Sequence, residues 1–500
     1  MKQKLNKKYI AVLALIFLVA VAVRTFGFGA VPGGFNQDGV MAAVDAKALS
    51  QYGTDRYGMR LPVHFTAWGF GQMSVLMSYL MVPFIRLFGL SVITARLPNL
   101  ICSLLGLLCL WLFSKKTFNI KAALTISAFA AICPWHIMQS RWALDCNLFP
   151  HFLIAGICFL LYGLKGRKIH IVLSMLCFGL SMYCYGISIY TVPVLLVALS
   201  VYLVASRQMN IKTVLLSALV YLAVAWPFIL CMILNAFNLE TLELPFCTIP
   251  VFHNSIRGAD IVFMSDKPLQ QLLNNLVSIL KIIFQCSHDP LHNEIPSFGT
   301  VYIISILFFL IGFFRMIKGA KRNTGAAFVL IFFAVAFLNG LITRNVNINR
   351  ANMIFYPMII MTGDGIYFTA TKIKYAKIAI PIVYAALFAC FTISYFTSYA
   401  DEIKEIFLED FGKAVSYASS LGGNKIYITP DSQYEGFAHV SEILTLYYAD
   451  VDSADYRSGE FSKKYSFTND EDAEITVKRE PESADSVKFG RFYVTDRRTQ

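Results

Sequence analysis

The sequence lacks a CxxC pair, although it contains eleven cysteines. Most of these cysteines lie inside apolar runs, and the last hundred residues contain none. Neither a disulfide framework nor a zinc site is therefore indicated.

The sequence also lacks an internal repeat, which weighs against transporter folds built from inverted repeats. No convincing small-residue cleavage site follows the first apolar run, 9–28. That run is long enough to span a bilayer and too long for most signal-peptide cores. We therefore expect a retained helix whose start lies in the cytoplasm.

Charged residues make up only 15% of the chain, whereas apolar residues make up 57% and aromatic residues 14%. With a mean hydropathy of +0.58, this composition indicates a polytopic membrane protein that lies in a lipid bilayer, rather than a set of soluble domains. The net charge is +12, but the basic residues form short groups between apolar runs, where they are typical topology signals. Nucleic acid is therefore not an expected partner.

The segment 73–89 decides the topology, because counting it as a span would invert every later loop. Pro83 and Arg86 suit a helix that lies in the outer interface better than a buried span. With the segment placed there, eleven transmembrane helices are expected. After the first, they are 92–113, 122–138, 147–164, 169–188, 190–205, 213–235, 298–314, 324–343, 351–370 and 378–396.

The loops that this threading assigns to the cytoplasm hold, with the N-terminal lysines, nineteen basic residues and no acid. This bias follows the positive-inside rule and is the reason for the choice. Every Asp and Glu falls on the outer side except Asp364, which we expect to be a paired or capped acid near the inner end of its span.

The C-terminal part of the chain changes character abruptly, since residues 399–500 carry twenty of the thirty-one acids. Residues 401–421 show a helical pattern, whereas 425–429 and 489–495 are typical of strands. We therefore expect an α-helical polytopic membrane domain, 1–398, with outer juxtamembrane helices and long outer loops at 29–91 and 236–297. A small extracytoplasmic α/β domain, 399–500, follows it.

Several acids stand beside the membrane directly after the first apolar run. Asp38, Asp45 and Asp55 lie within 35–62, with Lys47, Arg56 and Arg60 between them. Carboxylates lose hydration at that depth, so chemistry explains such a cluster better than packing does. An ordinary solvated loop is the alternative.

A second group of polar residues emerges at the outer end of the third span. It brings His136, Arg141 and Asp145 to the same surface as Asp38. Two acids delivered by separate helix ends suit a reaction that deprotonates an acceptor while a cation or a donor is held. The alternative is that Asp145 only pairs with Arg141 at a helix end.

A series of short motifs follows the same order as in a known family. They are Asn-Gln-Asp at 36–38, Asp45-Ala, Tyr-Gly-Thr-Asp-Arg-Tyr-Gly at 52–58, Pro62, Ser-Tyr-Leu-Met-Val-Pro-Phe at 78–84, Leu-Phe-Gly-Leu-Ser at 87–91, Ala-Arg-Leu-Pro at 95–98, Pro-Trp-His-Ile at 134–137 and Ser-Arg at 140–141. Together they resemble the bacterial membrane glycosyltransferases of the GT-C superfamily, close to glycosyltransferase family 39 and the protein O-mannosyltransferases. The resemblance covers the first 200 residues and recurs at 289–302 and 349–357.

This resemblance implies an inverting transfer of a sugar from a polyprenyl phosphate to an acceptor on the outer face of a bacterial plasma membrane. It implies that Asp38 is the general base, and that Asp145 assists acceptor or cation binding. Gly39 stands where many relatives have Glu, which argues against a tightly bound metal and leaves Asp45 or Asp55 as substitutes. A divalent cation stays open, with Asp38 and Asp145 as its candidate ligands.

The phosphate of such a donor needs fixed positive charge at the interface, and arginine supplies it without risk of deprotonation. Arg350 matches the family's outer-loop arginine and is the first candidate, with Arg141 and Arg60 behind it. Among the outer polar residues, His136 and His253, with Asp45 and Asp55, are candidate contacts of the acceptor or sugar.

Two alternative functions remain open at this point. An envelope-polysaccharide ligase or polymerase would also use outer arginines. A transporter or flippase would place acids or broken helices in mid-membrane, but the spans after the fourth are nearly free of ionisable residues. A shared outer cavity for Asp38, Asp145 and Arg350 would favour transfer to an envelope polymer, a glycolipid or a protein.

Overall fold

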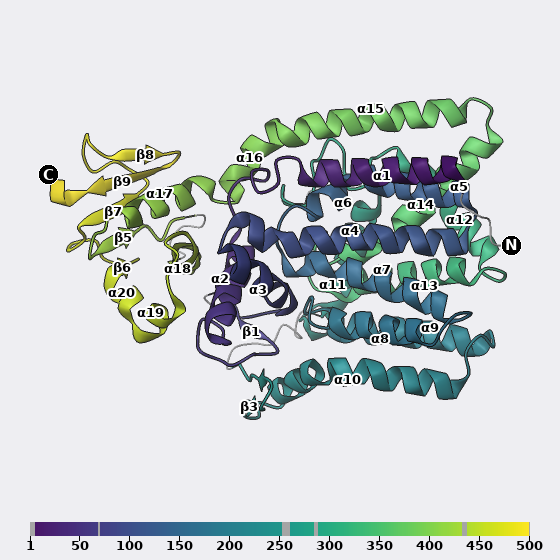
Figure 1. Cartoon of the computed structure of the whole chain (residues 1–500), viewed down its shortest axis with the longest axis horizontal. Coiled ribbons are helices and arrows are strands. Elements are labelled where there is room, and N and C mark those ends of the chain that lie inside the picture. The colour runs from purple at the N-terminus through teal and green to yellow at the C-terminus, as the bar shows by residue number, and fades with distance from the viewer. Residues whose placement is uncertain (1–5, 69–70, 253–260, 285–288, 433–437, 500) are drawn as a thin grey trace.

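The computed structural model describes residues 6–68, 71–252, 261–284, 289–432 and 438–499. Most of these residues form a bundle of long helices that run side by side (Figure 1). Eleven of the helices match the eleven expected spans: α1 (Lys7–Thr25), α4 (Val92–Thr117), α5 (Ile120–Ile132), α7 (Asp145–Gly163), α8 (Ile169–Ser181), α9 (Ser188–Ala205), α10 (Ile211–Ala236), α12 (Ser305–Gly319), α13 (Thr324–Ile342), α14 (Phe355–Lys372) and α15 (Ala376–Phe396).

Seven of these helices are long and apolar enough to cross a membrane by length and composition alone. They are α1, α4, α7, α9, α10, α13 and α15. The other four are shorter or carry charged residues at one end, as Arg315 and Lys318 of α12 show. The chain is therefore a multi-pass α-helical membrane protein.

Polar side chains begin several of the helices. Asn119, Asn210 and Asn323 precede α5, α10 and α13, and each side chain accepts hydrogen bonds from the first backbone N–H groups of its helix. Ser91 and Thr94 form a reciprocal capping box at the start of α4. These caps satisfy donors that a helix end leaves unpaired.

The centre of the bundle is formed by α7 and α14, whereas α15 and α10 lie at its edges (Figure 1). In an apolar stretch of 18 residues within α7, 78% of the residues are buried inside the protein, compared with 11% in the corresponding stretch of α15. The helices α12 and α14 approach each other closely at glycines. A Cβ atom at Gly312 would lie 1.8 Å from the Met361 carbonyl oxygen.

The third expected span is shorter than the prediction of 122–138. The helix α5 ends at Ile132, and a separate short helix, α6 (Pro134–Gln139), follows it. Pro134 has no backbone N–H to continue the hydrogen-bond ladder, so the chain changes direction there.

The end of the bundle that faces the C-terminal domain, here called the domain-facing end, is covered by short elements (Figure 1). They are α2 (Gln37–Tyr52), β1 (Phe65–Thr66), β2 (Gln72–Met73), α3 (Leu76–Phe88), β3 (Leu242–Glu243), β4 (Thr248–Ile249), a 3₁₀ turn η2 (Val262–Met264) and α11 (Pro268–Phe284). The helix α3 has 13 residues, which is too short to cross a bilayer and fits the expected juxtamembrane position.

The helix α11 was not expected, because 236–297 was predicted only as a long loop. Its buried face is formed by Asn275, Ile279, Ile282 and Ile283. The Asn275 side chain donates to the carbonyl oxygens of Leu341 and Thr343, at 2.8 and 2.7 Å. These bonds attach α11 to the end of α13.

The C-terminal part begins with α16 (Ser398–Ile406) and α17 (Glu409–Ser420). A five-stranded sheet then follows with strand order β6-β5-β7-β9-β8. Its elements are β5 (Ile426–Ile428), α18 (Ala438–Tyr448), α19 (Ser453–Ser458), α20 (Glu460–Lys464), β6 (Tyr465–Ser466), β7 (Ile475–Lys478), β8 (Val487–Phe489) and β9 (Phe492–Asp496), with a final 3₁₀ turn η4 (Arg497–Thr499). Strands β5, β6 and β7 are parallel, and β9 pairs antiparallel with β7 and β8.

Two predictions within this domain need correction. The expected helix 401–421 is broken at Leu408, whose φ is +55°. The expected strand 489–495 is confirmed over 492–495 as part of β9, but it begins too early, because Gly490, with φ +54°, turns the chain between β8 and β9. Glycine adopts positive φ at no steric cost, which favours the turn there.

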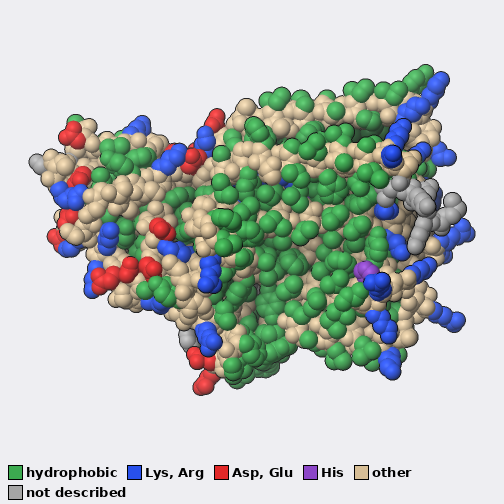
Figure 2. Space-filling view, in the orientation of Figure 1, with side chains coloured by type: hydrophobic (Ala, Val, Ile, Leu, Met, Phe, Trp, Pro, Cys, Tyr) green, Lys and Arg blue, Asp and Glu red, His purple; other side chains and the backbone are tan. Residues whose placement is uncertain are grey.

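Charge divides the molecule along its length. In the space-filling view, hydrophobic side chains cover the bundle, Lys and Arg gather at the end opposite the C-terminal domain, and the acids lie at the domain side (Figure 2). The one acid expected inside a span is paired, since Arg315 Nε lies 2.8 Å from Asp364 Oδ2. That prediction is confirmed.

Candidate functional site

A cavity of about 240 Å³ opens at the domain-facing end of the bundle. It lies between the start of α2, the start of α7, the turn from α8 to α9 and the loop from α13 to α14. Its lining residues are Asp38, Leu144, Asp145, Cys146, Tyr185, Gly186, Ile187, Thr343, Asn347, Asn349 and Arg350. The structure thus brings the two predicted acids and the first-choice arginine to one cavity.

Asp38 lies in the first turn of α2, which favours an acid because the helix dipole is positive there. Its carboxylate is held by Trp68, whose indole Nε1 donates to Oδ1 at 2.7 Å. Trp68 lies in the loop that connects β1 to β2. One carboxylate oxygen of Asp38 is therefore fixed by a side chain from a different part of the first loop.

Asp145 is the first residue of α7 and is only 3% exposed. Its Oδ1 accepts from the Cys146 backbone N–H at 2.7 Å. The N-terminus of α7 thus stabilises a negative charge at the wall of the cavity. A pairing of Asp145 with Arg141 was the alternative. The side-chain N–H groups of Arg141 donate to backbone carbonyls, and these bonds position Arg141.

Arg350 lies in the loop between α13 and α14, and its guanidinium donates to the carbonyl oxygens of Arg344 and Asn345. The backbone N–H of Arg350 donates to Asn347 Oδ1 at 2.9 Å. Its carbonyl oxygen accepts from the Asn339 side chain at 3.0 Å. The loop itself therefore holds the arginine at the cavity.

Asp289 attaches this loop to the segment between α11 and α12. Its Oδ2 accepts from the Ile348 N–H at 2.7 Å, and its Oδ1 accepts from Asn293 at 2.6 Å. Burial raises the pKa of the Asp289 carboxyl, and these hydrogen bonds oppose the rise. Burial also raises the pKa of the neighbouring Glu294 to about 7.

Several cavity residues were not predicted from the sequence. Tyr185 comes from the turn between α8 and α9, while Asn347 and Asn349 flank the arginine in its loop. The run Asn345-Val-Asn-Ile-Asn-Arg is a visible signal for the two asparagines. Nothing local marks Tyr185, because only the packing of α8 against α7 and of α9 against α13 brings it there.

Arg141 does not line this cavity. The side chain is fully buried, and it donates to the carbonyl oxygens of Val23, Phe26, Gly27 and Val31 at 2.7–3.2 Å. It therefore holds the end of α1 and the chain that follows, and its donors face backbone rather than a phosphate site.

The other candidates of the first loop also lie away from the cavity. Asp45 is buried and pairs with Arg56, whose backbone N–H donates to Asp45 Oδ1 at 3.0 Å. Asp55 accepts from the N–H groups of Tyr57 and Met59, at 3.0 and 2.8 Å, and so closes a turn. Arg60 is exposed, and its backbone forms a single antiparallel β-bridge with Thr54.

His136 is buried in the bundle rather than at the cavity. Its Nδ1 lies 3.0 Å from Arg24 Nη2, and its Nε2 lies 3.1 Å from the Tyr356 hydroxyl. Arg24 donates further to the carbonyl oxygens of Ala20 in α1 and Ala131 near the end of α5. His253, the remaining candidate, lies outside the described residues.

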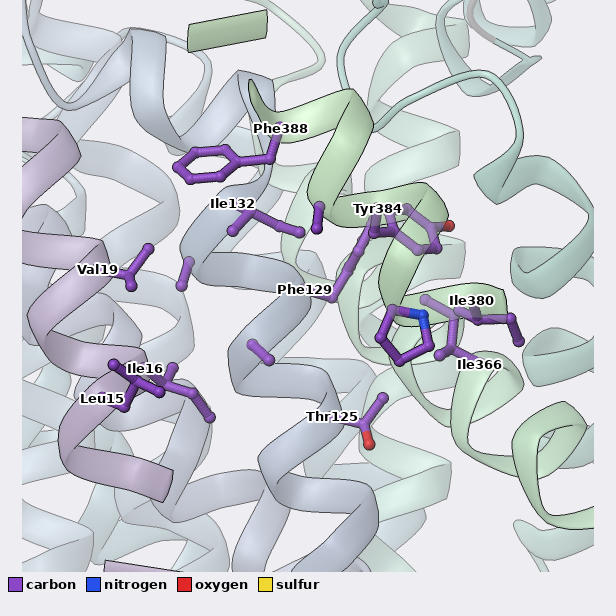
Figure 3. A pocket seen from close by; sticks show the side chains of 14 residues that line it. Leu15, Ile16, Val19, Thr125, Phe129, Ile132, Ile366, Ile380, Tyr384 and Phe388 are labelled. Atoms are coloured by element: carbon purple, nitrogen blue, oxygen red, sulfur yellow. The ribbon is translucent and has the colours of Figure 1, made fainter. Parts of the chain in front are cut away.

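A larger cavity of about 440 Å³ lies within the bundle between α1, α5, α14 and α15. Apolar side chains such as Leu15, Phe129, Ile366 and Phe388 line it, and Tyr384 is one of its few polar members (Figure 3). A surface of this kind offers an apolar chain van der Waals contact but gives no charge to a phosphate. The smaller cavity, in contrast, is lined by two carboxylates and an arginine.

The smaller cavity has carboxylates and an arginine among its lining residues. A carboxylate removes a proton from an attacking hydroxyl, and a guanidinium stabilises charge on a departing phosphate. The two carboxylates and the carboxamides of Asn347 and Asn349 are also oxygen donors of the type that hard divalent cations prefer. Among the described residues, no group of three or more His, Cys, Asp or Glu side chains forms a metal cluster.

Comparison with known proteins gives one family match. The family model described as dolichyl-phosphate-mannose-protein mannosyltransferase matches residues 72–232. A comparison with curated proteins finds no match.

Solved structures share the fold across nearly the whole chain. ArnT from Cupriavidus metallidurans, bound to undecaprenyl phosphate, superimposes with a TM-score of 0.60 at 13% identity, over 96% of this chain and 97% of that one. The archaeal oligosaccharyltransferase AglB from Archaeoglobus fulgidus, in complex with an inhibitory peptide and a dolichol-phosphate, gives a TM-score of 0.54 at 12% identity. That match covers 87% of this chain and 64% of AglB, so this chain spans less than two thirds of its length.

Proposed function

We propose that this chain, whose GT-C resemblance and fold are confirmed, transfers a sugar from a polyprenyl-phosphate donor to a hydroxyl acceptor on the outer face of a bacterial plasma membrane. The observation that carries the proposal is the single cavity lined by Asp38, Asp145 and Arg350. The matched structures that hold undecaprenyl phosphate and dolichol-phosphate support the class of donor.

The reaction follows from the groups around the cavity. The Asp38 carboxylate accepts the proton of the acceptor hydroxyl while its oxygen forms a bond to the anomeric carbon. The bond from that carbon to the phosphate oxygen breaks, and the polyprenyl phosphate leaves with both electrons. One displacement of this kind inverts the anomeric carbon.

Arg350 supplies fixed positive charge to the leaving phosphate. A guanidinium stays protonated at any accessible pH and can bond two phosphate oxygens at once. Because its loop already positions the side chain, little reorganisation is needed when the charge develops. Asp145 is proposed to orient the acceptor from the N-terminus of α7.

The orientation in the membrane is part of the proposal. The lysines and arginines at the end opposite the C-terminal domain support a cytoplasmic position for that end and for the N-terminus, by the positive-inside rule. The cavity and the C-terminal domain then lie outside, where a lipid-linked sugar with its phosphate at the interface can reach Arg350. A polysaccharide ligase would share this geometry, whereas a transporter would not require the acid pair at one end.

The substitution Asp38→Asn tests the proposed base. It keeps the shape of the side chain but removes its proton affinity, so the transfer rate should fall at least about 10²-fold. Mass spectrometry of cells should show lipid-phospho-sugar accumulating and an envelope glycan missing. Asp485→Asn, at an exposed position in the C-terminal domain, is the matched control and should behave as the natural protein.

If Asp38→Asn cells retain both the glycan and normal levels of the lipid-linked sugar, the assignment of the base is wrong.

A divalent cation in the cavity is a separate proposal, with Asp38 and Asp145 as its ligands beside Asn347 and Asn349. Such an ion would supply positive charge near the phosphate when it is bound. Treatment of the purified protein with EDTA should then reduce transfer, and added Mg²⁺ or Mn²⁺ should restore it. Transfer that is unchanged after exhaustive chelation would show that Arg350 suffices.

A further inference from the structure

A second polar cavity, of about 180 Å³, lies where the C-terminal domain meets the first outer loop. Arg56, Tyr57 and Trp68 come from the loop, whereas His439, Glu442 and Tyr456 come from α18 and α19. The function proposed above makes no use of this cavity. Its side chains include three aromatic rings, an acid and a guanidinium.

The two halves of this cavity are held together by specific contacts. Lys47 Nζ of α2 lies 2.7 Å from Asp450 Oδ1 and 3.1 Å from the Val451 carbonyl oxygen. The Tyr52 hydroxyl donates to Asp452 Oδ1 at 2.8 Å. The cavity is therefore a built interface between α2, which carries Asp38, and the C-terminal domain.

The aromatic rings and the charged groups alternate around the cavity. The Tyr57 and Tyr456 rings lie 5.9 Å apart with a 58° tilt, and the Arg56 guanidinium lies 4.5 Å from the centre of the Tyr57 ring. The Tyr456 hydroxyl donates to Glu442 Oε1 at 3.0 Å, and His439 Nδ1 lies 3.6 Å from Glu442 Oε2. The cavity therefore offers apolar ring faces next to side chains that can form hydrogen bonds.

Trp68 connects this cavity to the candidate active site. The same indole that lines the second cavity donates its Nε1–H to Asp38 at 2.7 Å. A molecule in the second cavity therefore lies one indole side chain away from the proposed base. A ligand that shifts the Trp68 indole therefore also shifts the Asp38 carboxylate that the indole binds.

We propose that the second cavity binds a saccharide portion of the acceptor, so that the accepting hydroxyl reaches past Trp68 to Asp38. This proposal rests on the proposed function and narrows its acceptor to a glycan. The C–H faces of a sugar ring pack on aromatic rings, and its hydroxyls bond groups such as Glu442 and His439. A peptide is favoured less, because the lining residues stand on helices and a loop and offer no strand edge for main-chain pairing.

The test is saccharide binding by the full-length protein in detergent, measured by saturation-transfer-difference NMR. The probes are α-mannobiose, chitobiose and lactose, with a Ser/Thr-containing peptide as the alternative. At least one disaccharide should bind the natural protein, and Glu442→Gln and Tyr456→Ala should each weaken it roughly tenfold, as expected for a lost charged hydrogen bond or a lost ring contact. Tyr493→Ala, on β9 and outside the cavity, is the matched control and should bind normally.

The proposal is overturned if no disaccharide binds, if only the peptide binds, or if both cavity variants bind as the natural protein does. Tyr456 also packs against Phe461, so thermal unfolding must accompany that variant. The near-isosteric Glu442→Gln decides the question where Tyr456→Ala unfolds. Suppose that Glu442→Gln weakens disaccharide binding while Asp38→Asn leaves transfer intact. The proposed base would then be refuted, and this inference would stand.

Discussion

At the scale of single residues, two of the three arginines predicted to bind phosphate, Arg350 and Arg141, have different surroundings. Arg350 lines the cavity and is held by its own loop. Arg141 is fully buried and donates to four backbone carbonyls around the end of α1. The sequence predicts an outer position for both arginines, but it does not show where their side-chain N–H groups point.

Substitution separates the two roles. Arg350→Ala should lower the transfer rate by about 10²–10³-fold with little change in thermal unfolding, because a pre-positioned charge is lost from the leaving group. Arg141→Met should instead lower the unfolding temperature, since each carbonyl left without a donor costs about 1–3 kcal/mol. Both are measured on detergent-purified protein, by transfer assay and by thermal unfolding.

Equal stability losses with equal rate losses in the two variants would contradict this division.

At the scale of elements, the spans and their sides could be predicted because they depend on local composition. Lysine groups between apolar runs determine the threading, and that threading placed Asp38, Asp145 and Arg350 at one end. The spacing of apolar residues in 268–284 also carries a signal for α11, which a prediction based on polarity alone missed. Tyr185 could not be predicted, since its position depends on how separate helices pack.

The packing of α12 on α14 gives the prediction at this scale. Gly312→Ala would place a methyl group against the Met361 carbonyl, so the helices must separate, at a cost of about 1–3 kcal/mol. The measurement is the unfolding temperature in detergent. Gly319→Ala, on the same helix, is the control, because its Cβ would meet only Ala326 at 3.9 Å. A Gly312 variant as stable as the control would show that this contact does not hold the bundle together.

At the scale of the whole molecule, one arrangement of charge accounts for both the topology and the position of the site. Lysines and arginines gather at one end of the bundle, and the acid-rich domain extends from the other end (Figure 2). The cavity lies beside that domain, and α2 joins the two through Lys47 and Tyr52. If the chain crossed the membrane in the opposite orientation, the cavity and the domain would both lie in the cytoplasm.

Cysteine labelling in intact cells tests this orientation. The C-terminal hundred residues contain no cysteine, so Asp485→Cys introduces a single exposed thiol in the domain. A membrane-impermeant maleimide should label it without permeabilisation, whereas Lys372→Cys, at the end of α14 on the basic side, should be labelled only after the membrane is opened. The natural protein gives the background from its own thiols. Because both positions are exposed, a reversed pattern could not arise from burial, and it would place the cavity on the side of the membrane where the positive-inside rule forbids it.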